Sequence, residues 1–145
     1  MKRISRSAIV EHSAEKMYGL VDDIESYPEF LPWCAEARVT EMDGRRHATL
    51  TAAMHGLRQS FTTLNDNRPG EAIDLQLVEG PFRRFSAAWR FRPLAPRACA
   101  IEFTLEYEFA SGALARLLEP LFNHIADTMV DAFTRRADAV DPGAA

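Results

Sequence analysis

The fold is decided by the stretch GALARLLEPLFNHIADTMVDAFTRRA, Gly112 to Ala137. Its apolar residues recur every three or four positions, the spacing that aligns them along one side of an α-helix. They are Leu114, Leu117, Leu118, Leu121, Phe122, Ile125, Met129 and Phe133, and the opposite side carries Arg116, Asn123, Asp127, Asp131 and Thr134. At about 1.5 Å per residue this helix is roughly 40 Å long. An apolar face of that length needs a broad sheet to cover it.

The chain before this helix alternates between short strand patterns and turn signals. We predict strands at residues 3–10, 38–41, 46–56, 59–65, 72–78, 85–92 and 101–109, with turns at pairs such as Asp43-Gly44 and Pro69-Gly70. After the first strand, Ser13 is suited to cap a short amphipathic helix. Pro28 and Pro32 exclude a long regular helix over residues 27–34, so we expect a short helix or a tight loop there.

The last two strands predict an antiparallel sheet with one apolar and one charged face. Phe85, Ala87, Trp89 and Phe91 alternate with Arg84, Arg90 and Arg92, and the next strand alternates apolar residues with Glu102, Glu106 and Glu108. Antiparallel pairing would set the arginines opposite the glutamates as an exposed ladder, in which each pair stabilises by about 0.2–1 kcal/mol. A curved sheet of about six to seven strands around the long helix, with two short helices after the first strand, is an α+β helix-grip fold. We expect a concavity between sheet and helix, lined by aromatic side chains.

The composition is that of one ordinary globular domain. A chain of 145 residues with 47% hydrophobic residues can bury a core, and we assign the domain to residues 1–138 with a flexible tail at 139–145. The net charge of -4 argues against a DNA-binding surface. Cys34 and Cys99 lie far apart and are expected to stay reduced. Because no stretch has the pattern of a signal peptide or a membrane span, we predict a cytoplasmic protein, and leave open a location at the periphery of the inner membrane.

Motifs for catalysis and for cofactors are not found in the sequence. It contains no G-x-S-x-G, no G-x-G-x-x-G and no G-x-x-x-x-G-K. The histidines at positions 12, 47, 55 and 124 lack the spacing of metal ligands. Cys34 follows Trp33 in an apolar segment without a cationic neighbour, which predicts a buried and unreactive thiol. We therefore expect no catalytic residue, no metal and no cofactor, and a protein that is not an enzyme.

Five segments together carry a resemblance to a known family. They are HSAEKMY at 12–18, LVDDIESYPEFLPWC at 20–34, LVEGPF at 77–82, WRFRPL at 89–94 and AFTRRA at 132–137. They resemble the coenzyme Q-binding START-like proteins of the polyketide cyclase/dehydrase and lipid transport superfamily, whose bacterial branch includes ribosome association toxins. The resemblance covers residues 8 to about 138. It implies a helix-grip fold, also described as Bet v 1-like, and a hydrophobic tunnel suited to an isoprenoid quinone.

The apolar faces and the resemblance together predict non-enzymatic binding, transport or chaperoning of a hydrophobic isoprenoid lipid, ubiquinone above all, in support of respiration. The candidate ligand-binding residues are Tyr27, Phe30, Leu31, Trp33, Phe61, Leu77, Phe82, Phe85, Trp89, Phe103, Tyr107, Leu118, Phe122, Ile125 and Met129. We expect residues 27–34 and Phe82 to form the mouth of the cavity.

Two alternatives remain open. The first, implied by the resemblance, is a toxin that binds the large ribosomal subunit and blocks subunit joining, through exposed basic clusters such as Arg45-Arg46 and Arg83-Arg84. Binding to ribosomal RNA should weaken steeply with salt, whereas lipid uptake should not. The second is a cyclase-like enzyme that acts on an aromatic or polyketide substrate.

Overall fold

The computed structural model describes residues 1–140, which form seven strands, two α-helices and one 3-10 helix. In chain order they are β1 (Lys2–Val10), α1 (Ala14–Asp22), the 3-10 helix η1 (Ile24–Glu29), β2 (Cys34–Met42), β3 (Arg45–Met54), β4 (Leu57–Arg68), β5 (Ala72–Glu79), β6 (Phe82–Ala95), β7 (Ala98–Phe109) and α2 (Gly112–Val140). The order of elements is the one that the sequence predicts.

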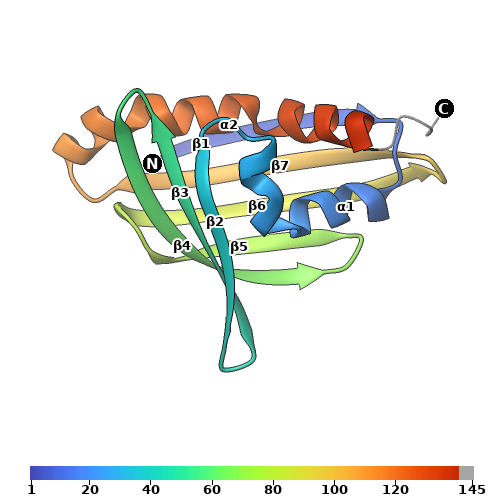
Figure 1. Cartoon of the computed structure of the whole chain (residues 1–145), viewed down its shortest axis with the longest axis horizontal. Helices are drawn as coiled ribbons and strands as arrows, with labels where there is room; N and C mark the ends of the chain where they lie inside the picture. Colours follow the sequence, from blue (N-terminus) through green and yellow to red (C-terminus); the bar gives the residue numbers. More distant parts are fainter. Residues whose placement is uncertain (141–145) are drawn as a thin grey trace.

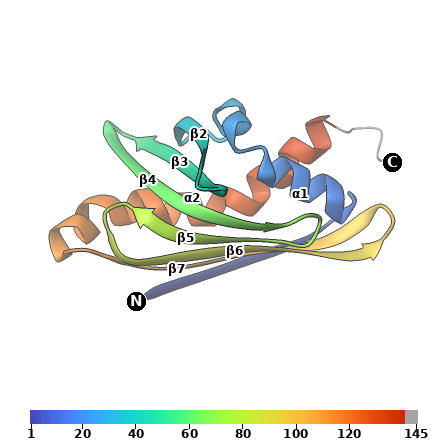
Figure 2. The ribbon, with the colours of Figure 1, turned by 90° about the horizontal axis from the view of Figure 1, so that it is seen from below.

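All seven strands belong to one antiparallel sheet, in the order β1-β7-β6-β5-β4-β3-β2. Figures 1 and 2 show that α2 lies along one face of this sheet, while β2, β3 and the first part of β4 curve round towards it. The tip of the β2–β3 hairpin projects away from the rest of the molecule (Figure 1). The predicted helix-grip architecture is therefore confirmed.

Two hairpin turns in the curved part of the sheet use pairs of residues with positive φ. Asp43 (54°) and Gly44 (73°) join β2 to β3 as expected. His55 (51°) and Gly56 (81°) join β3 to β4 in the same way. Positive φ at both central residues suits a type I′ turn, which commonly carries Asn-Gly or Asp-Gly. The strand predicted over residues 46–56 therefore ends at Met54. The turn was missed because its first position holds a histidine instead of the asparagine or aspartate that is typical of this turn.

Local chemistry explains how α1 begins and where the turn after η1 packs. The Ser13 hydroxyl accepts a hydrogen bond from the backbone N–H of Lys16 at 3.1 Å, which confirms the predicted helix cap. Pro28 lies inside η1, which is a short 3-10 helix, as the two prolines led us to expect. The Phe30 ring contacts Phe133 of α2, with ring centroids 5.1 Å apart. This contact holds the turn after η1 against the end of the long helix.

The apolar face of α2 is buried as predicted, with one exception. Leu118, Phe122 and Phe133 are almost inaccessible to solvent, but Leu117 is 55% exposed. Leu117 lies about 100° round the helix from Leu118, at the margin of the apolar stripe, so it points past the sheet. The helix also continues to Val140, beyond the expected domain boundary at residue 138, and residues 141–145 of the predicted tail lie outside the described part of the chain.

On the outer face of the sheet two arginines of β6, Arg84 and Arg90, lie opposite glutamates of β7 as predicted, but the ion pairs differ. Arg90 lies opposite Glu102 on β7, as expected for the charge ladder. Its guanidinium nevertheless bonds to Asp74 on β5, at 2.8 Å. Each arginine has neighbours on two adjacent strands, so the alternating pattern of one hairpin could not decide between them. In residues 1–140, none of the helices is both long enough and apolar enough to traverse a lipid bilayer.

Candidate functional site

The space between the sheet and α2, where the sequence predicts a ligand tunnel, is almost completely filled. An apolar cavity of about 30 Å³ lies between the sheet and the α1–η1 segment, and this is about the volume of one water molecule in the liquid. Its walls come from α1, η1 and strands β3 to β6, and they include Tyr27, Phe61 and Trp89. Small-molecule pockets commonly measure roughly 300–1,000 Å³. This cavity is therefore too small for such a ligand in this structure.

The structure brings the candidate ligand-binding residues together as a packed core. Tyr27, Leu31, Trp33, Phe61, Phe82, Trp89, Phe103, Tyr107, Leu118, Phe122, Ile125 and Met129 are buried, and Phe30, Leu77 and Phe85 are partly buried against them. Three of them, Tyr27, Phe61 and Trp89, line the small cavity. Ring-to-ring contacts fill the space that a ligand would need. Phe82, for example, lies 5.0 Å from Phe122 and 5.2 Å from Phe109 between ring centroids.

The segment expected to form the mouth is packed into the interior. Trp33 is 2% exposed and Leu31 is 1% exposed. The hydroxyl of Tyr27 donates a hydrogen bond to the backbone carbonyl of Val21, which fixes the segment to α1. In this conformation three of the four large side chains of the segment are buried and Phe30 is partly buried, while the role of the segment and Phe82 as the mouth of a cavity stays a prediction.

Two polar residues inside the sheet were not predicted as part of the site. Thr63 and Asn65 are buried on β4 and line the small cavity. The Thr63 hydroxyl donates to the side-chain carbonyl of Asn65 at 2.7 Å. Both share the inward parity of Phe61, and that alternation is the signal from which they could have been found.

Titratable groups in the core are held in their neutral forms. Burial raises the pKa of the Cys34 thiol to about 11, and it also raises the pKa of Cys99. Burial, reinforced by the charges of Glu119 and Asp127, raises the pKa of Tyr107 to about 12. None of these groups is poised as a nucleophile or a general base near neutral pH. Within residues 1–140, no group of three or more His, Cys, Asp and Glu side chains is arranged to hold a metal ion.

A much larger hollow lies on the outer face of the sheet, away from α2. This outer trough measures about 900 Å³ and its lining is mainly polar. It is formed by Arg3, Tyr18, Glu41, Gly44, Arg45, Arg46, Leu64, Asn65, Asp66, Asn67, Asp74, Leu75, Gln76, Ser86, Ala87, Ala88, Thr104 and Glu106. Of these residues, the sequence places Glu106 on the charged, solvent-facing side of the sheet, and it predicts no hollow there.

One corner of the outer trough is fixed by a polar cluster between α1 and the sheet. Arg46 bonds to the Asp22 carboxylate and to the Asp22 backbone carbonyl, each at 2.8 Å. The side-chain amide of Asn67 donates to the same carboxylate at 2.7 Å and to the Tyr18 hydroxyl at 2.9 Å. Arg46 is therefore committed to an internal ion pair, which corrects the expectation that Arg45-Arg46 forms an exposed basic cluster. Arg45 itself is exposed.

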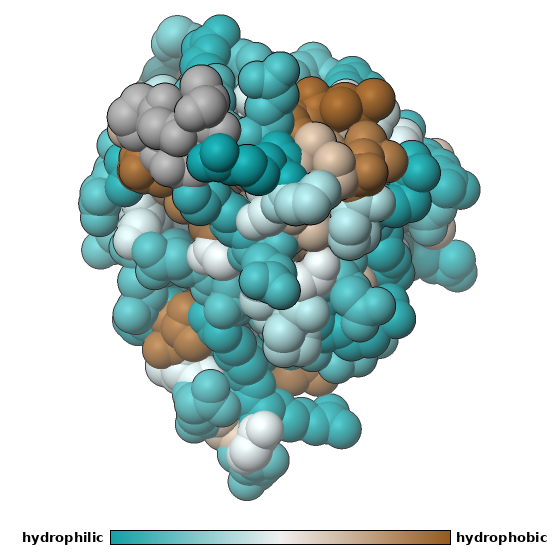
Figure 3. All heavy atoms as spheres, turned by 90° about the vertical axis from the view of Figure 1, so that its right-hand side faces the viewer, coloured by the Kyte–Doolittle hydropathy of each residue, from teal (hydrophilic) through white to brown (hydrophobic). Residues whose placement is uncertain are grey.

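Exposed apolar side chains are scattered over several elements. Figure 3 shows one end of the molecule, where hydrophobic residues gather in a small patch at the upper right among hydrophilic ones. Ile9 on β1 is 77% exposed, and it lies opposite Ala100 on β7. Leu94, which is 46% exposed, lies where the β6–β7 register shifts. Both side chains are exposed to solvent and are not part of the buried core.

Solved structures share this architecture. An aromatase/cyclase from Streptomyces aligns with a TM-score of 0.81 at 17% identity, covering 94% of this chain and 93% of that one. A START superfamily protein from Mycobacterium smegmatis aligns with a TM-score of 0.80 at 20% identity, covering 95% and 98%. At these identities the likeness establishes the fold and nothing about the reaction or the ligand.

Similarity in sequence extends over nearly the whole chain. The ribosome association toxin RatA of Vibrio cholerae is 43% identical over 97% of this chain and 98% of its own length, and that of Escherichia coli is 41% identical over 97% and 89%. The mitochondrial coenzyme Q-binding protein COQ10 homolog B of Xenopus laevis is 27% identical over 96% of this chain and 60% of its own length. Residues 10–134 match the family described as polyketide cyclase / dehydrase and lipid transport. The chain belongs to this polyketide cyclase / dehydrase and lipid transport family.

Proposed function

We propose that this protein is a ribosome association toxin that binds the large ribosomal subunit and blocks subunit joining. The observation that carries the proposal is the alignment of 97% of the chain, at 41–43% identity, with relatives that bear that name. The alignment includes the strands of the outer face and the projecting hairpin as well as the core. A similarity of this extent supports a shared binding activity rather than a shared fold alone.

The packed interior supports the same choice. A cavity of about 30 Å³ would have to grow about tenfold before it could hold a ligand of ordinary size. The 900 Å³ hollow lies on the solvent face of the sheet instead. A protein with a filled core and a hollowed outer face is better suited to contact a macromolecule than to enclose a lipid.

Cosedimentation with purified ribosomal subunits tests the proposal. We expect the protein to sediment with the large subunit and to reduce the fraction of joined ribosomes when both subunits are mixed. Binding should weaken as salt is added, because contacts between charged surfaces are screened. Sedimentation with neither subunit, or an unchanged fraction of joined ribosomes at saturating protein, would contradict the proposal.

A second candidate, binding of ubiquinone or a related polyprenyl lipid, is favoured by the similarity to a protein named as coenzyme Q-binding. The aromatic lining of the small cavity, which includes Trp89, is chemically suited to a quinone ring. The core would have to open to admit it. Burial of the tail would then contribute about 0.8 kcal/mol per methylene, so affinity should rise with tail length until the space is full.

Two measurements decide whether the second candidate holds. Organic extraction of the purified protein followed by mass spectrometry should reveal a co-purifying polyprenyl quinone. Titration with a short-chain ubiquinone should quench tryptophan emission saturably, and the Trp33→Phe variant would leave Trp89 as the remaining indole. An empty extract together with a titration that does not saturate would exclude the lipid-carrier hypothesis and leave ribosome binding alone.

A further inference from the structure

The floor of the outer trough consists of two neighbouring rows of side chains, one of which crosses four strands and the other five. One row runs Thr104, Ala88, Asp74 and Asp66, and the other runs Arg3, Glu106, Ser86, Gln76 and Leu64. The middle positions, Ser86, Ala88 and Thr104, are small, and this is why the surface is hollow there. Strands lie about 4.8 Å apart, so the distance from β4 to β1 is roughly 19 Å. An extended polypeptide of about six residues has that length.

Carboxylates lie at both ends of this floor. Asp66 and Asp74 face each other on paired strands, an arrangement in which like charges repel. Asp74 is compensated by Arg90, whereas Asp66 makes no ion pair with any residue of the described chain. At the other end Glu106 bonds to Arg3 at 3.3 Å, in an exposed pair that a competing cation can replace at little cost.

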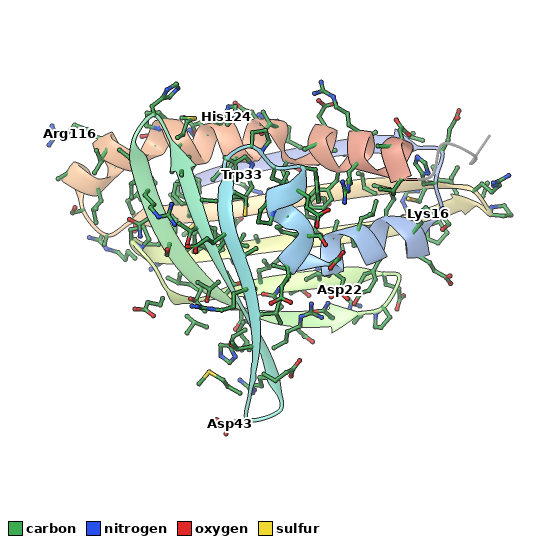
Figure 4. The ribbon with its side chains drawn as sticks, viewed as in Figure 1. Lys16, Asp22, Trp33, Asp43, Arg116 and His124 are labelled. Carbon is green, nitrogen blue, oxygen red and sulfur yellow. The ribbon has the colours of Figure 1, made fainter. Side chains whose placement is uncertain are left out.

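One side of the trough is walled by the tip of the β2–β3 hairpin. Figure 4 shows Asp43 at the far end of this hairpin, well away from the body of the molecule. Glu41 and Arg45 reach the trough from the hairpin, and Glu41, like Asp66, has no ion-pair partner within residues 1–140. Of the three arginines in the lining, Arg3 and Arg46 are already paired. The charges still available for a partner are therefore two carboxylates and one guanidinium.

We propose that the outer trough binds an extended, lysine- and arginine-rich segment of a ribosomal protein. This inference rests on the proposed function and names the kind of surface that would be recognised on the ribosome. Cations of the segment would lie beside Asp66 at one end and beside Glu106, in place of Arg3, at the other, with its backbone over Ser86 and Thr104. The same carboxylates disfavour a phosphate backbone, and the net charge of -4 acts in the same direction.

Binding of labelled peptides to the full chain tests the trough directly. The probe is a fluorescein-labelled peptide of about eight residues that alternates lysine and serine, measured by fluorescence anisotropy at low ionic strength. Saturable binding is expected, with none for a peptide that alternates glutamate and serine. Asp66→Asn should weaken binding about two- to fivefold, because one exposed charge pair is lost. Asp131→Asn, which removes an exposed carboxylate from α2, is the matched control and should change nothing.

A second variant tests the shape of the trough rather than its charge. Ser86→Trp places a large ring in the hollow and should weaken peptide binding about tenfold or more. Ser7→Trp adds the same ring on the outer face of β1, outside the trough lining, and serves as its control. Ser86 and Ser7 are both exposed, so both variants should fold, which circular dichroism verifies. Peptide binding that survives Ser86→Trp, or that Ser7→Trp reduces equally, would overturn the proposal.

Cosedimentation separates this inference from the proposed function. If the unaltered protein sediments with large subunits and Ser86→Trp does not, the trough is the docking surface. If both sediment equally, the trough is not that surface, although ribosome binding stands. If the unaltered protein does not sediment at all, the proposed function is wrong. Competition by a uridine octanucleotide that Asp66→Asn strengthens would show that the trough binds RNA instead, and would also overturn the proposal.

Discussion

The two faces of the central sheet are built from the same strands, but the inner face is buried and tightly packed, whereas the outer face is exposed and hollowed. On β6 the inward residues Ala87, Trp89 and Phe91 are buried, whereas the outward residues Ser86 and Arg92 are exposed. Large inward rings meet one another and the rings of α2, and the apolar cavity beside them measures only about 30 Å³. Small outward side chains leave a hollow of about 900 Å³.

This difference shows that aromatic content is a poor guide to where a protein can accept a partner. Large apolar side chains pack to crystal-like density when their shapes fit, so a region rich in them is more often filled than hollow. A hollow needs small residues in the middle and larger ones around them. The inner face should therefore govern stability and the outer face should govern recognition.

The largest expected effect comes from a charge on the inner side of α2. Met129→Glu puts a carboxylate at a position that is 7% exposed, and we expect it to lower the free energy of unfolding by about 2–7 kcal/mol. Asp131→Ala, two residues on, removes only an exposed pair with Arg135 and should change it by less than about 0.5 kcal/mol. Urea denaturation at neutral pH measures both. Equal midpoints would mean that the inner face does not govern stability.

The next largest effect is a gain in stability, which we expect from a substitution at the exposed position Pro120 of the same helix. Pro120 cannot donate a backbone hydrogen bond to Arg116, and from the sequence we expect it to bend the helix and loosen residues 112–119. The α2 helix nevertheless extends through it from Gly112 to Val140. Pro120→Ala should stabilise the fold by about 2 kcal/mol, because the gain in helix propensity exceeds the loss of restriction on the unfolded chain.

Hydrogen exchange shows whether Pro120 loosens the first turns of α2. Amides of residues 112–119 should exchange more slowly in Pro120→Ala than in the unaltered protein, while those of β7 should be unchanged. Arg116→Ala, at a neighbouring exposed position, is the control. Identical exchange in all three proteins would show that these turns are held by packing alone.

Local features of the fold could be predicted from the sequence, and features set by packing between distant segments could not. The Ser13 cap and the Asp43-Gly44 turn are decided by neighbouring residues, and the structure contains both. The choice of Asp74 rather than Glu102 as the partner of Arg90 depends on the third strand of the sheet. The outer trough depends on where the β2–β3 hairpin lies, and the closure of the inner cavity depends on how the rings interlock.

The pH dependence of stability should report the neutral thiol on the inner face. Cys34 has a pKa of about 11 in the fold, raised by burial from an ordinary value of 9.0. A raised pKa means that the unfolded chain loses this proton first, so the stability that the neutral thiol contributes is present below pH 9 and is lost as pH rises towards 11. The loss should be at most about 1.4 kcal/mol per pH unit.

The Cys34→Ala variant separates the contribution of the thiol to the pH dependence of stability from that of the buried tyrosines. Urea denaturation of both proteins between pH 8 and 11 should give a steeper fall for the unaltered protein, since Tyr27 and Tyr107 titrate in both. Near neutral pH the free energies of unfolding of the two proteins should differ by an amount that does not change with pH. Parallel curves throughout would mean that Cys34 is not shielded from solvent, against the 4% exposure that the structure gives it.

The smallest expected effect is on the outer face, where ion pairs are exposed. Arg90 lies opposite Glu102 on one neighbouring strand but bonds to Asp74 on the other at 2.8 Å, with both side chains roughly two-fifths exposed. A double-mutant cycle with Arg90→Ala and Asp74→Ala should give a coupling free energy of about 0.2–1 kcal/mol. The cycle of Arg90→Ala with Glu102→Ala should give a smaller value. Added salt should reduce the first coupling, because both groups are in contact with solvent. A larger coupling for Glu102 would mean that strand register sets the charge pairing, and a coupling of several kcal/mol in either cycle would mean that the outer face, like the inner one, holds the fold together.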